Sequence, residues 1–172
     1  MNPIIKNIWR VVFLLLLQLL VFRQMQIQGL CFNYVHILIY PMFILLLPVD
    51  ISNSWLLMLG FLIGIAVDMF YDSPGLHASA AVLLAFVRPI VLHQLEPRGG
   101  YKVNSVPTRN EFGDNWFYKY ASILLGVHLL AYFMLEAFQI GLIGSVLIKT
   151  VTSLVASLLI VGLYMLIFNP KA

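Results

Sequence analysis

The sequence contains few charged residues. Of its 172 residues, 10% are charged and 62% are hydrophobic, whereas a soluble domain usually has about 25% charged and about 45–50% apolar residues. A water-soluble fold of this composition would expose a large apolar surface and aggregate. The composition therefore excludes an ordinary soluble enzyme, a nucleic-acid-binding domain and a disordered tail. It indicates a protein that crosses a membrane several times.

Cysteine is almost absent, and recognisable catalytic motifs are missing. Cys31 is the single cysteine, so an internal disulfide and a cysteine-based zinc site are excluded. No Walker loop, GxSxG motif or HExxH motif occurs, and no two histidines have the spacing of metal ligands. The four histidines are His36, His77, His93 and His128. We expect them to be packed or interfacial, and we expect no catalytic residue, no metal and no cofactor.

Long apolar runs make up most of the sequence. A membrane-spanning helix needs roughly 20 residues, so a chain of 172 residues holds at most about six spans with short connections. We predict one membrane domain, residues 1–172, that folds as an all-α bundle of six transmembrane helices. The predicted spans are about residues 8–22, 32–47, 55–70, 76–95, 116–135 and 141–168, with a loop at 96–115.

Prolines and turn residues shape two of these spans. The second run contains Pro41, which removes a backbone donor, and it ends at Pro48. We expect this helix to be packed within the bundle, where its neighbours can satisfy the unpaired carbonyl. The third and fourth runs are separated only by Tyr71-Asp72-Ser73-Pro74-Gly75. This turn composition predicts a tight antiparallel hairpin.

The basic residues are distributed unevenly. With six spans, Arg23 alone falls on one side, and seven basic residues fall on the other: Lys6, Arg10, Arg98, Lys102, Arg109, Lys119 and Lys171. Lysine and arginine are retained on the cytoplasmic side, so we predict that both termini and the loop are cytoplasmic. Within the loop, Arg98, Lys102 and Arg109 suit either an acidic partner or anionic lipid headgroups.

Asp68, Arg88 and Lys149 fall inside predicted spans, where charge is costly. A rise of about 1.5 Å per residue places Asp68 and Lys149 at similar depths below the outer surface. We predict that they form an interhelical ion pair, with an ion or proton pathway as the functional alternative. Arg88 lies closer to the cytoplasmic side, and we predict that it snorkels toward that side, helped by a bend at Pro89.

Small residues recur at helical spacing. Gly60 and Gly64 share a helix face with Asp68, and Ser153 and Ser157 form a similar strip in the last run. In lipid, such strips allow helices to approach closely. Internal packing is the more common use, but the spacing leaves open whether the glycine face serves this chain or a partner.

Four segments carry a family resemblance: Tyr40–Pro48, Gly64–His77, Phe86–Pro89 and Arg98–Tyr101. The most specific of them is the acidic hairpin, whose distinguishing residues are Asp68, Asp72, Pro74, Gly75 and His77. Together these segments resemble the MreD family of rod shape-determining proteins, particularly the form found in Bacteroidota. The resemblance covers nearly the whole chain.

The resemblance implies a multi-pass subunit of the bacterial inner membrane. Such a subunit is a non-enzymatic scaffold that maintains cell shape and organises peptidoglycan synthesis in the cell-elongation complex. The implied partners are an MreC-like bitopic protein and, through it, the actin-like MreB, the glycosyltransferase RodA and a class B penicillin-binding transpeptidase. The implied fold is similar to the substrate-binding subunit of energy-coupling-factor transporters.

Two other functions compete with a scaffold. The first is the substrate-binding membrane subunit of a vitamin transporter, which would share the bundle. Such subunits resemble one another in small residues on the first helix, and Ile8–Phe22 has no alanine or glycine. The second is an intramembrane enzyme acting on a lipid-linked substrate, which would use Asp68 or Asp72 together with His77.

Overall fold

The computed structural model describes residues 11–22 and 35–168. Within these residues the chain forms helices and no strand. Four helices are long and apolar enough to cross a membrane: α4 (Asn53–Tyr71), α5 (Leu76–Gln94), α7 (Asp114–Ala137) and α8 (Ile143–Phe168). They coincide with the predicted spans at 55–70, 76–95, 116–135 and 141–168. In the described residues, the regular structure is therefore all helical, with several long apolar helices.

Shorter helices complete the described chain. The first helix, Val11–Phe22, is apolar and ends in a π-helical turn, η1, at Gln18–Phe22. The remaining elements are α3 (Met42–Leu45), α6 (Arg109–Phe112) and the 3₁₀ turn η2 (Ile140–Leu142). The first residues of the predicted spans at 8–22 and 32–47 lie outside the described residues.

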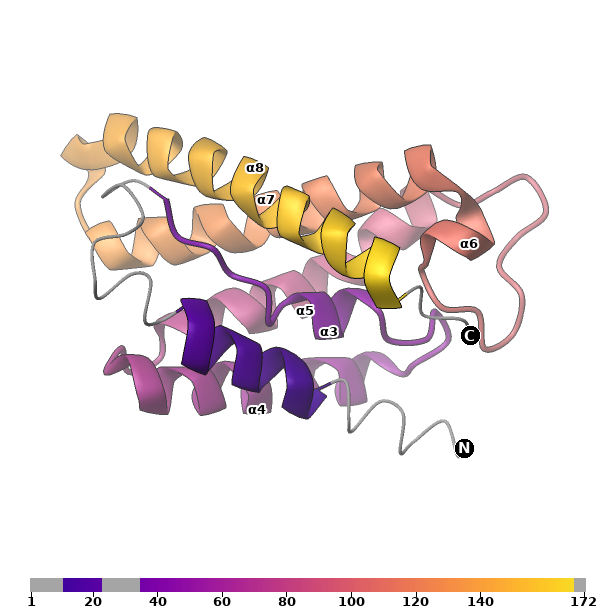
Figure 1. The fold of residues 1–172 in the computed structure, drawn as a ribbon, viewed down its shortest axis with the longest axis horizontal. Coiled ribbons are helices and arrows are strands. Elements are labelled where there is room, and N and C mark those ends of the chain that lie inside the picture. The colour runs from indigo at the N-terminus through magenta and orange to yellow at the C-terminus, as the bar shows by residue number, and fades with distance from the viewer. Residues whose placement is uncertain (1–10, 23–34, 169–172) are drawn as a thin grey trace.

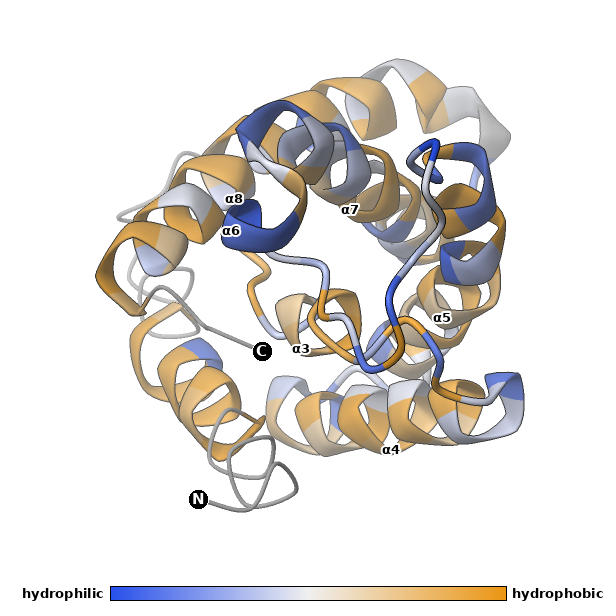
Figure 2. Ribbon diagram, turned by 90° about the vertical axis from the view of Figure 1, so that its right-hand side faces the viewer, coloured by the Kyte–Doolittle hydropathy of each residue, from blue (hydrophilic) through white to orange (hydrophobic). Residues whose placement is uncertain are grey.

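The prediction of a membrane-spanning helix over 32–47 is wrong for its described part. Residues 35–41 are not helical, and only the four residues of α3 follow as a helix. We call residues 35–48 the central segment, because the first helix, α4, α5, α7 and α8 form a ring around α3 in Figure 2. Its residues from Leu38 to Leu47 are buried.

The two ends of the bundle differ. In Figure 1, α6, the start of α4 and the end of α8 lie at one end, which we call the loop end. The α4–α5 turn and the α7–α8 connection lie at the opposite end, which we call the hairpin end. The central segment runs lengthwise between the two ends. The bundle therefore has the loop 96–113 and both termini of the described chain at the same end.

The α4–α5 hairpin is tight because of its glycines. Asp72 and Gly75 adopt left-handed conformations with φ of 52° and 86°, and glycine reaches such angles without steric cost. A Cβ atom placed on Gly64 would lie 2.3 Å from the Ala78 Cα, and one on Gly60 would lie 3.0 Å from the Ala81 carbonyl oxygen. The Gly60/Gly64 face therefore serves the packing of α4 against α5.

Candidate functional site: polar side chains around the central segment

Two serines of α8 hold the half of the central segment that lies toward the hairpin end. The backbone N–H of His36 donates to the Ser153 Oγ at 2.9 Å, and that of Leu38 donates to the Ser157 Oγ at 3.3 Å. Four residues of helix rise about 6 Å, and two residues of extended chain advance about 6.6 Å. The serine spacing thus matches alternate amides of an extended chain. Ser153 and Ser157 are hydrogen-bond acceptors here as well as small packing residues.

Gln18 of the first helix satisfies the opposite edge of the segment. Its Oε1 accepts from the Ile39 N–H at 2.8 Å, while its Nε2 donates to the Ile37 carbonyl at 3.2 Å and to the Tyr71 hydroxyl at 2.8 Å. Gln18 is fully buried. Non-helical backbone persists at membrane depth only where protein surrounds and satisfies it. These side chains explain why residues 35–41 do not need to be helical.

The middle of the segment is fixed through a tyrosine–histidine contact. The Tyr40 hydroxyl lies 2.9 Å from the His128 Nε2 on α7. Both residues are buried, and their rings meet edge to face with centroids 5.3 Å apart. The sequence predicted that His128 would be packed or interfacial, and the structure places it inside the ring of helices.

Arg88 holds the end of the segment that lies toward the loop end of the bundle. It is only 1% exposed, and its guanidinium donates to the Tyr120 hydroxyl and to the carbonyls of Leu47 and Pro48. Tyr120 in turn donates to the Leu45 carbonyl. The prediction that Arg88 snorkels to the membrane surface is wrong, because the carbonyls at the end of α3 are nearer partners than solvent.

Asp68 caps the N-terminus of α5. Its carboxylate accepts from the backbone N–H groups of Gly75 at 3.1 Å, and of His77 and Ala78 at 3.0 Å. The Ser73 hydroxyl and the His77 Nδ1 each lie 3.0 Å from the Asp68 Oδ1. A helix N-terminus favours a negative charge, and the close approach of α4 at Gly64 brings the carboxylate there.

The predicted ion pair between Asp68 and Lys149 is therefore wrong. The Lys149 Nζ lies 3.2 Å from the Glu136 Oε2, near the end of α7. The Asp68 carboxylate is instead surrounded by donors of its own hairpin. Equal depth in the bundle did not bring the two side chains together, because α7 supplies a nearer acid.

His77 lies among aromatic rings. The centroids of Tyr132, Tyr71 and Tyr40 are 4.7, 5.0 and 5.8 Å from that of His77. Its Nε2 is buried without a hydrogen-bond partner. Asp68 and His77 thus form a hydrogen-bonded pair, but the other ring nitrogen has no hydrogen-bonded nucleophile. Asp72, the other acid considered for an enzyme, is exposed in the turn.

Residues 96–113 cover the loop end of the bundle. The Val49 N–H donates to the Ser105 carbonyl at 2.9 Å, and the Tyr101 hydroxyl donates to the Leu92 carbonyl at 2.7 Å. Desolvation raises the pKa of Tyr101 to about 12. Arg109 forms a two-point contact with Asp114, at 2.5 and 2.9 Å. Of the three predicted basic loop residues, Arg98 and Lys102 are exposed, and Arg109 is half-buried in its ion pair.

Sequence reasoning missed Gln18, Tyr40 and Tyr120 as parts of the site. For Gln18 a signal existed, because it is the single polar residue in Val11–Phe22 and polar groups inside a membrane need partners. For the tyrosines there was none, since a tyrosine at a helix or segment end also suits the membrane interface. Arg88 was singled out, but its partners were not.

Several of the buried polar side chains form hydrogen bonds with the backbone of the central segment. Among the described residues, no three His, Cys, Asp or Glu side chains lie close enough to hold a metal ion. Comparisons with protein-family models, with curated proteins and with solved structures found no match for this chain. Half of the buried polar residues bind the central segment from the surrounding helices: Gln18, Arg88, His128, Ser153 and Ser157.

Proposed function

We propose that this protein is a non-enzymatic scaffold subunit of the bacterial inner membrane that organises peptidoglycan synthesis in the cell-elongation complex and so maintains cell shape. One observation supports the proposal above others. Arg88 of α5, His128 of α7 and two serines of α8 contact the central segment, and the large apolar side chains of these helices that face outward are exposed. Such a chain offers its partners a rigid apolar surface within the bilayer.

We also propose that the chain crosses the membrane six times, with the central segment as the second crossing. Residues 35–39, if extended at about 3.3 Å each, and the turn and helical residues 40–47 at about 1.5 Å each together cover about 28 Å. That length is close to the roughly 30 Å hydrocarbon core of a bilayer. Such an arrangement is related, in this proposal, to the substrate-binding subunit of energy-coupling-factor transporters.

The proposed partners contact the exposed helix faces. Large apolar side chains project outward at Met69 on α4, Phe86 on α5 and Leu159 on α8, with exposed fractions of 77%, 61% and 70%. An MreC-like bitopic protein, with its own single membrane helix, is the partner that such faces suit. MreB, RodA and the class B transpeptidase join through it. The exposed Arg98 and Lys102 are available to anionic headgroups of the bilayer.

A photo-crosslinking scan tests the proposal. A photoreactive amino acid is placed at Met69, Phe86 or Leu159 in cells, and captured proteins are identified by mass spectrometry. We expect at least one face to capture a bitopic cell-wall protein. Leu84 is fully buried on α5, so the same amino acid there serves as the control and should capture none.

Co-purification and depletion separate the two leading functions. In mild detergent, recovery of wall-synthesis proteins supports the scaffold, and recovery of a transport ATPase module supports the vitamin transporter instead. Depletion of a scaffold should give rounded cells while each isolated wall-synthesis enzyme keeps its activity. Rod-shaped growth after complete depletion contradicts the proposal.

A further inference from the structure

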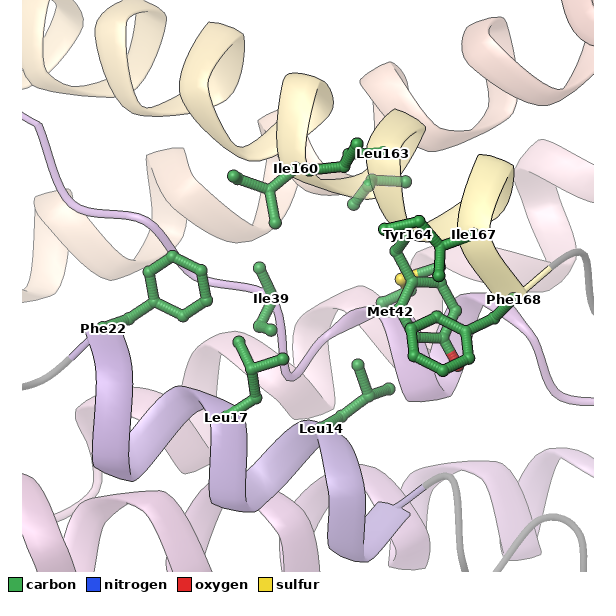
Figure 3. Close-up of a pocket in the computed structure, with 11 residues that line it drawn as sticks. Leu14, Leu17, Phe22, Ile39, Met42, Ile160, Leu163, Tyr164, Ile167 and Phe168 are labelled. Atoms are coloured by element: carbon green, nitrogen blue, oxygen red, sulfur yellow. The ribbon is translucent and has the colours of Figure 1, made fainter.

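A cavity of about 190 Å³ lies between the first helix, the central segment and the last part of α8. Figure 3 shows Leu14 and Leu17 facing Ile160 and Tyr164 across it, with Ile39 from the central segment between them. The residues that line it are aliphatic or aromatic throughout, with Met42 as the single sulfur-containing one. The cavity is thus a hydrocarbon-walled space beside the central segment.

Polar and aromatic contacts hold the first helix on either side of this cavity. At its C-terminal turn, Gln18 bonds to the central segment and to Tyr71 of α4. Near its start, the Phe13 ring meets the Phe168 ring of α8, with centroids 5.2 Å apart. Between these two contacts the first helix and α8 are separated by the cavity.

The sizes and exposures indicate what fills this space. An apolar cavity of about 150 Å³ stays without water and takes up small apolar molecules. Here the rim residues Leu163 and Ile167 of α8 are 53% and 65% exposed. In a bilayer these rim residues face hydrocarbon, so lipid tails are the apolar groups next to the opening.

We propose that this cavity binds one acyl chain of a membrane glycerophospholipid, which enters laterally between the first helix and α8. The acyl chain lies against Ile39 and Met42 of the central segment and fills the hydrocarbon-walled space. This site adjoins the proposed partner face at Leu159 on α8, but it depends on membrane insertion and not on the scaffold function.

Photolabelling tests the site directly. The full chain is reconstituted in vesicles of phosphatidylethanolamine and phosphatidylglycerol that contain phosphatidylethanolamine with a diazirine in its acyl chain. We expect labelled peptides to carry the adduct at Ile160 and Tyr164, inside the cavity, as well as at Leu159 and Leu166, which are 70% and 67% exposed. Labelling of Leu159 and Leu166 without Ile160 and Tyr164 means that the cavity is covered by another segment or protein, which overturns the proposal.

A filling variant distinguishes a bound chain from passing lipids. Leu17→Trp places a larger side chain in the cavity. Leu16→Trp places the same side chain on the outside of the helix, where Leu16 is 50% exposed. We expect Leu17→Trp to reduce adducts at Ile160 and Tyr164 at least fivefold relative to those at Leu159, while Leu16→Trp leaves this ratio unchanged. An equal ratio in both folded variants, or in the wild type and Leu17→Trp, also overturns the proposal.

Discussion

Arg88 and Tyr120 fix the same end of the central segment from two different helices. The Arg88 Nε donates to the Tyr120 hydroxyl at 2.9 Å, and Tyr120 donates onward to the Leu45 carbonyl at 3.0 Å. Arg88 also donates to the carbonyls of Leu47 and Pro48. None of these contacts of Arg88 involves a carboxylate. The buried guanidinium is instead satisfied by the carbonyls that follow α3, and the C-terminal end of a helix favours a cation.

Replacing Arg88 by leucine should destabilise the bundle more than any change to the exposed basic residues. The carbonyls of Leu47 and Pro48 lose their donor, and each buried group left unsatisfied costs about 1–3 kcal/mol. Arg88→Lys should recover only part of the loss, because an ammonium group lacks the planar fork of the guanidinium. Denaturant unfolding of the purified protein in detergent micelles measures the change in free energy.

The exposed Arg98 provides the control for this experiment. Arg98→Leu removes the same charge from the loop, where surface substitutions usually change stability by less than about 0.5 kcal/mol. Equal unfolding free energies for Arg88→Leu and Arg98→Leu would show that the hydrogen bonds of Arg88 do not hold the segment.

Alanine substitutions at Ser153 and Ser157 distinguish packing from hydrogen bonding. Alanine is as small as serine, so a strip used only for helix packing tolerates the change. If the serines accept from the His36 and Leu38 amides, each substitution should cost about 1–3 kcal/mol. Ser145→Ala is the matched control, because the Ser145 Oγ donates to the Leu142 carbonyl three residues earlier and not to the central segment. Near-wild-type stability of all three variants contradicts a stabilising role for the hydrogen bonds from the His36 and Leu38 amides to the two serines.

The long helices were predictable because their information is local. Apolar runs of sixteen or more residues appear at α4, α5 and α8, each bounded by Pro, Gly or Asp residues, and no other element satisfies so long a backbone in lipid. The α4–α5 hairpin was predictable for a similar reason, since Asp72 and Gly75 suit left-handed conformations.

The central segment was not predictable by the same reasoning. A short apolar run around Pro41 has no periodicity that distinguishes a buried helix from buried extended chain. What decides between them is a set of distant partners: Ser153 is 117 positions from His36 in the sequence. Depth along a helix likewise gives one coordinate of Asp68 and Lys149, whereas their pairing depends also on helix rotation.

Gly64→Ala should be much more harmful than Gly60→Ala. The new Cβ at Gly64 would lie 2.3 Å from the Ala78 Cα and 2.7 Å from its backbone nitrogen, so α4 and α5 must move apart. At Gly60 the nearest atom is 3.0 Å away. Overpacking of this kind costs about 1–3 kcal/mol. Thermal unfolding in detergent checks the order.

Gly144 is the control for both glycine variants. A Cβ added there meets nothing within 4 Å, and alanine in a helix is favoured over glycine by roughly 0.5–1 kcal/mol. Gly144→Ala should therefore be neutral or stabilising. A loss at Gly144 as large as that at Gly64 would falsify the assignment of the Gly64 effect to contact with α5.

A double-mutant cycle identifies the partner of Lys149. The changes in unfolding free energy caused by Glu136→Gln and Lys149→Met should be non-additive by about 0.2–1 kcal/mol, the range measured for exposed ion pairs. Substitutions of Asp68 to asparagine and Lys149 to methionine should add within about 0.5 kcal/mol. Strong coupling of Asp68 with Lys149, and none with Glu136, contradicts the observed pairing.

The number of crossings depends on whether the central segment passes through the whole bilayer. If it does, a reporter fused at Gln26 lies outside and one at Asn53 lies in the cytoplasm. Ser73 at the hairpin end should then report the outside, and Asn104 and Ala172 the cytoplasm, as the basic residues at the loop end predict. Two reporter enzymes are used at each position, one active only in the cytoplasm and one active only outside, so every position gives a positive signal with one of them.

A segment that enters and leaves on the same side would put Gln26 and Asn53 on the same side of the membrane, and the chain would then cross five times. Opposite signals at these two positions, with Asn53 and Asn104 alike, are the outcome that six crossings require.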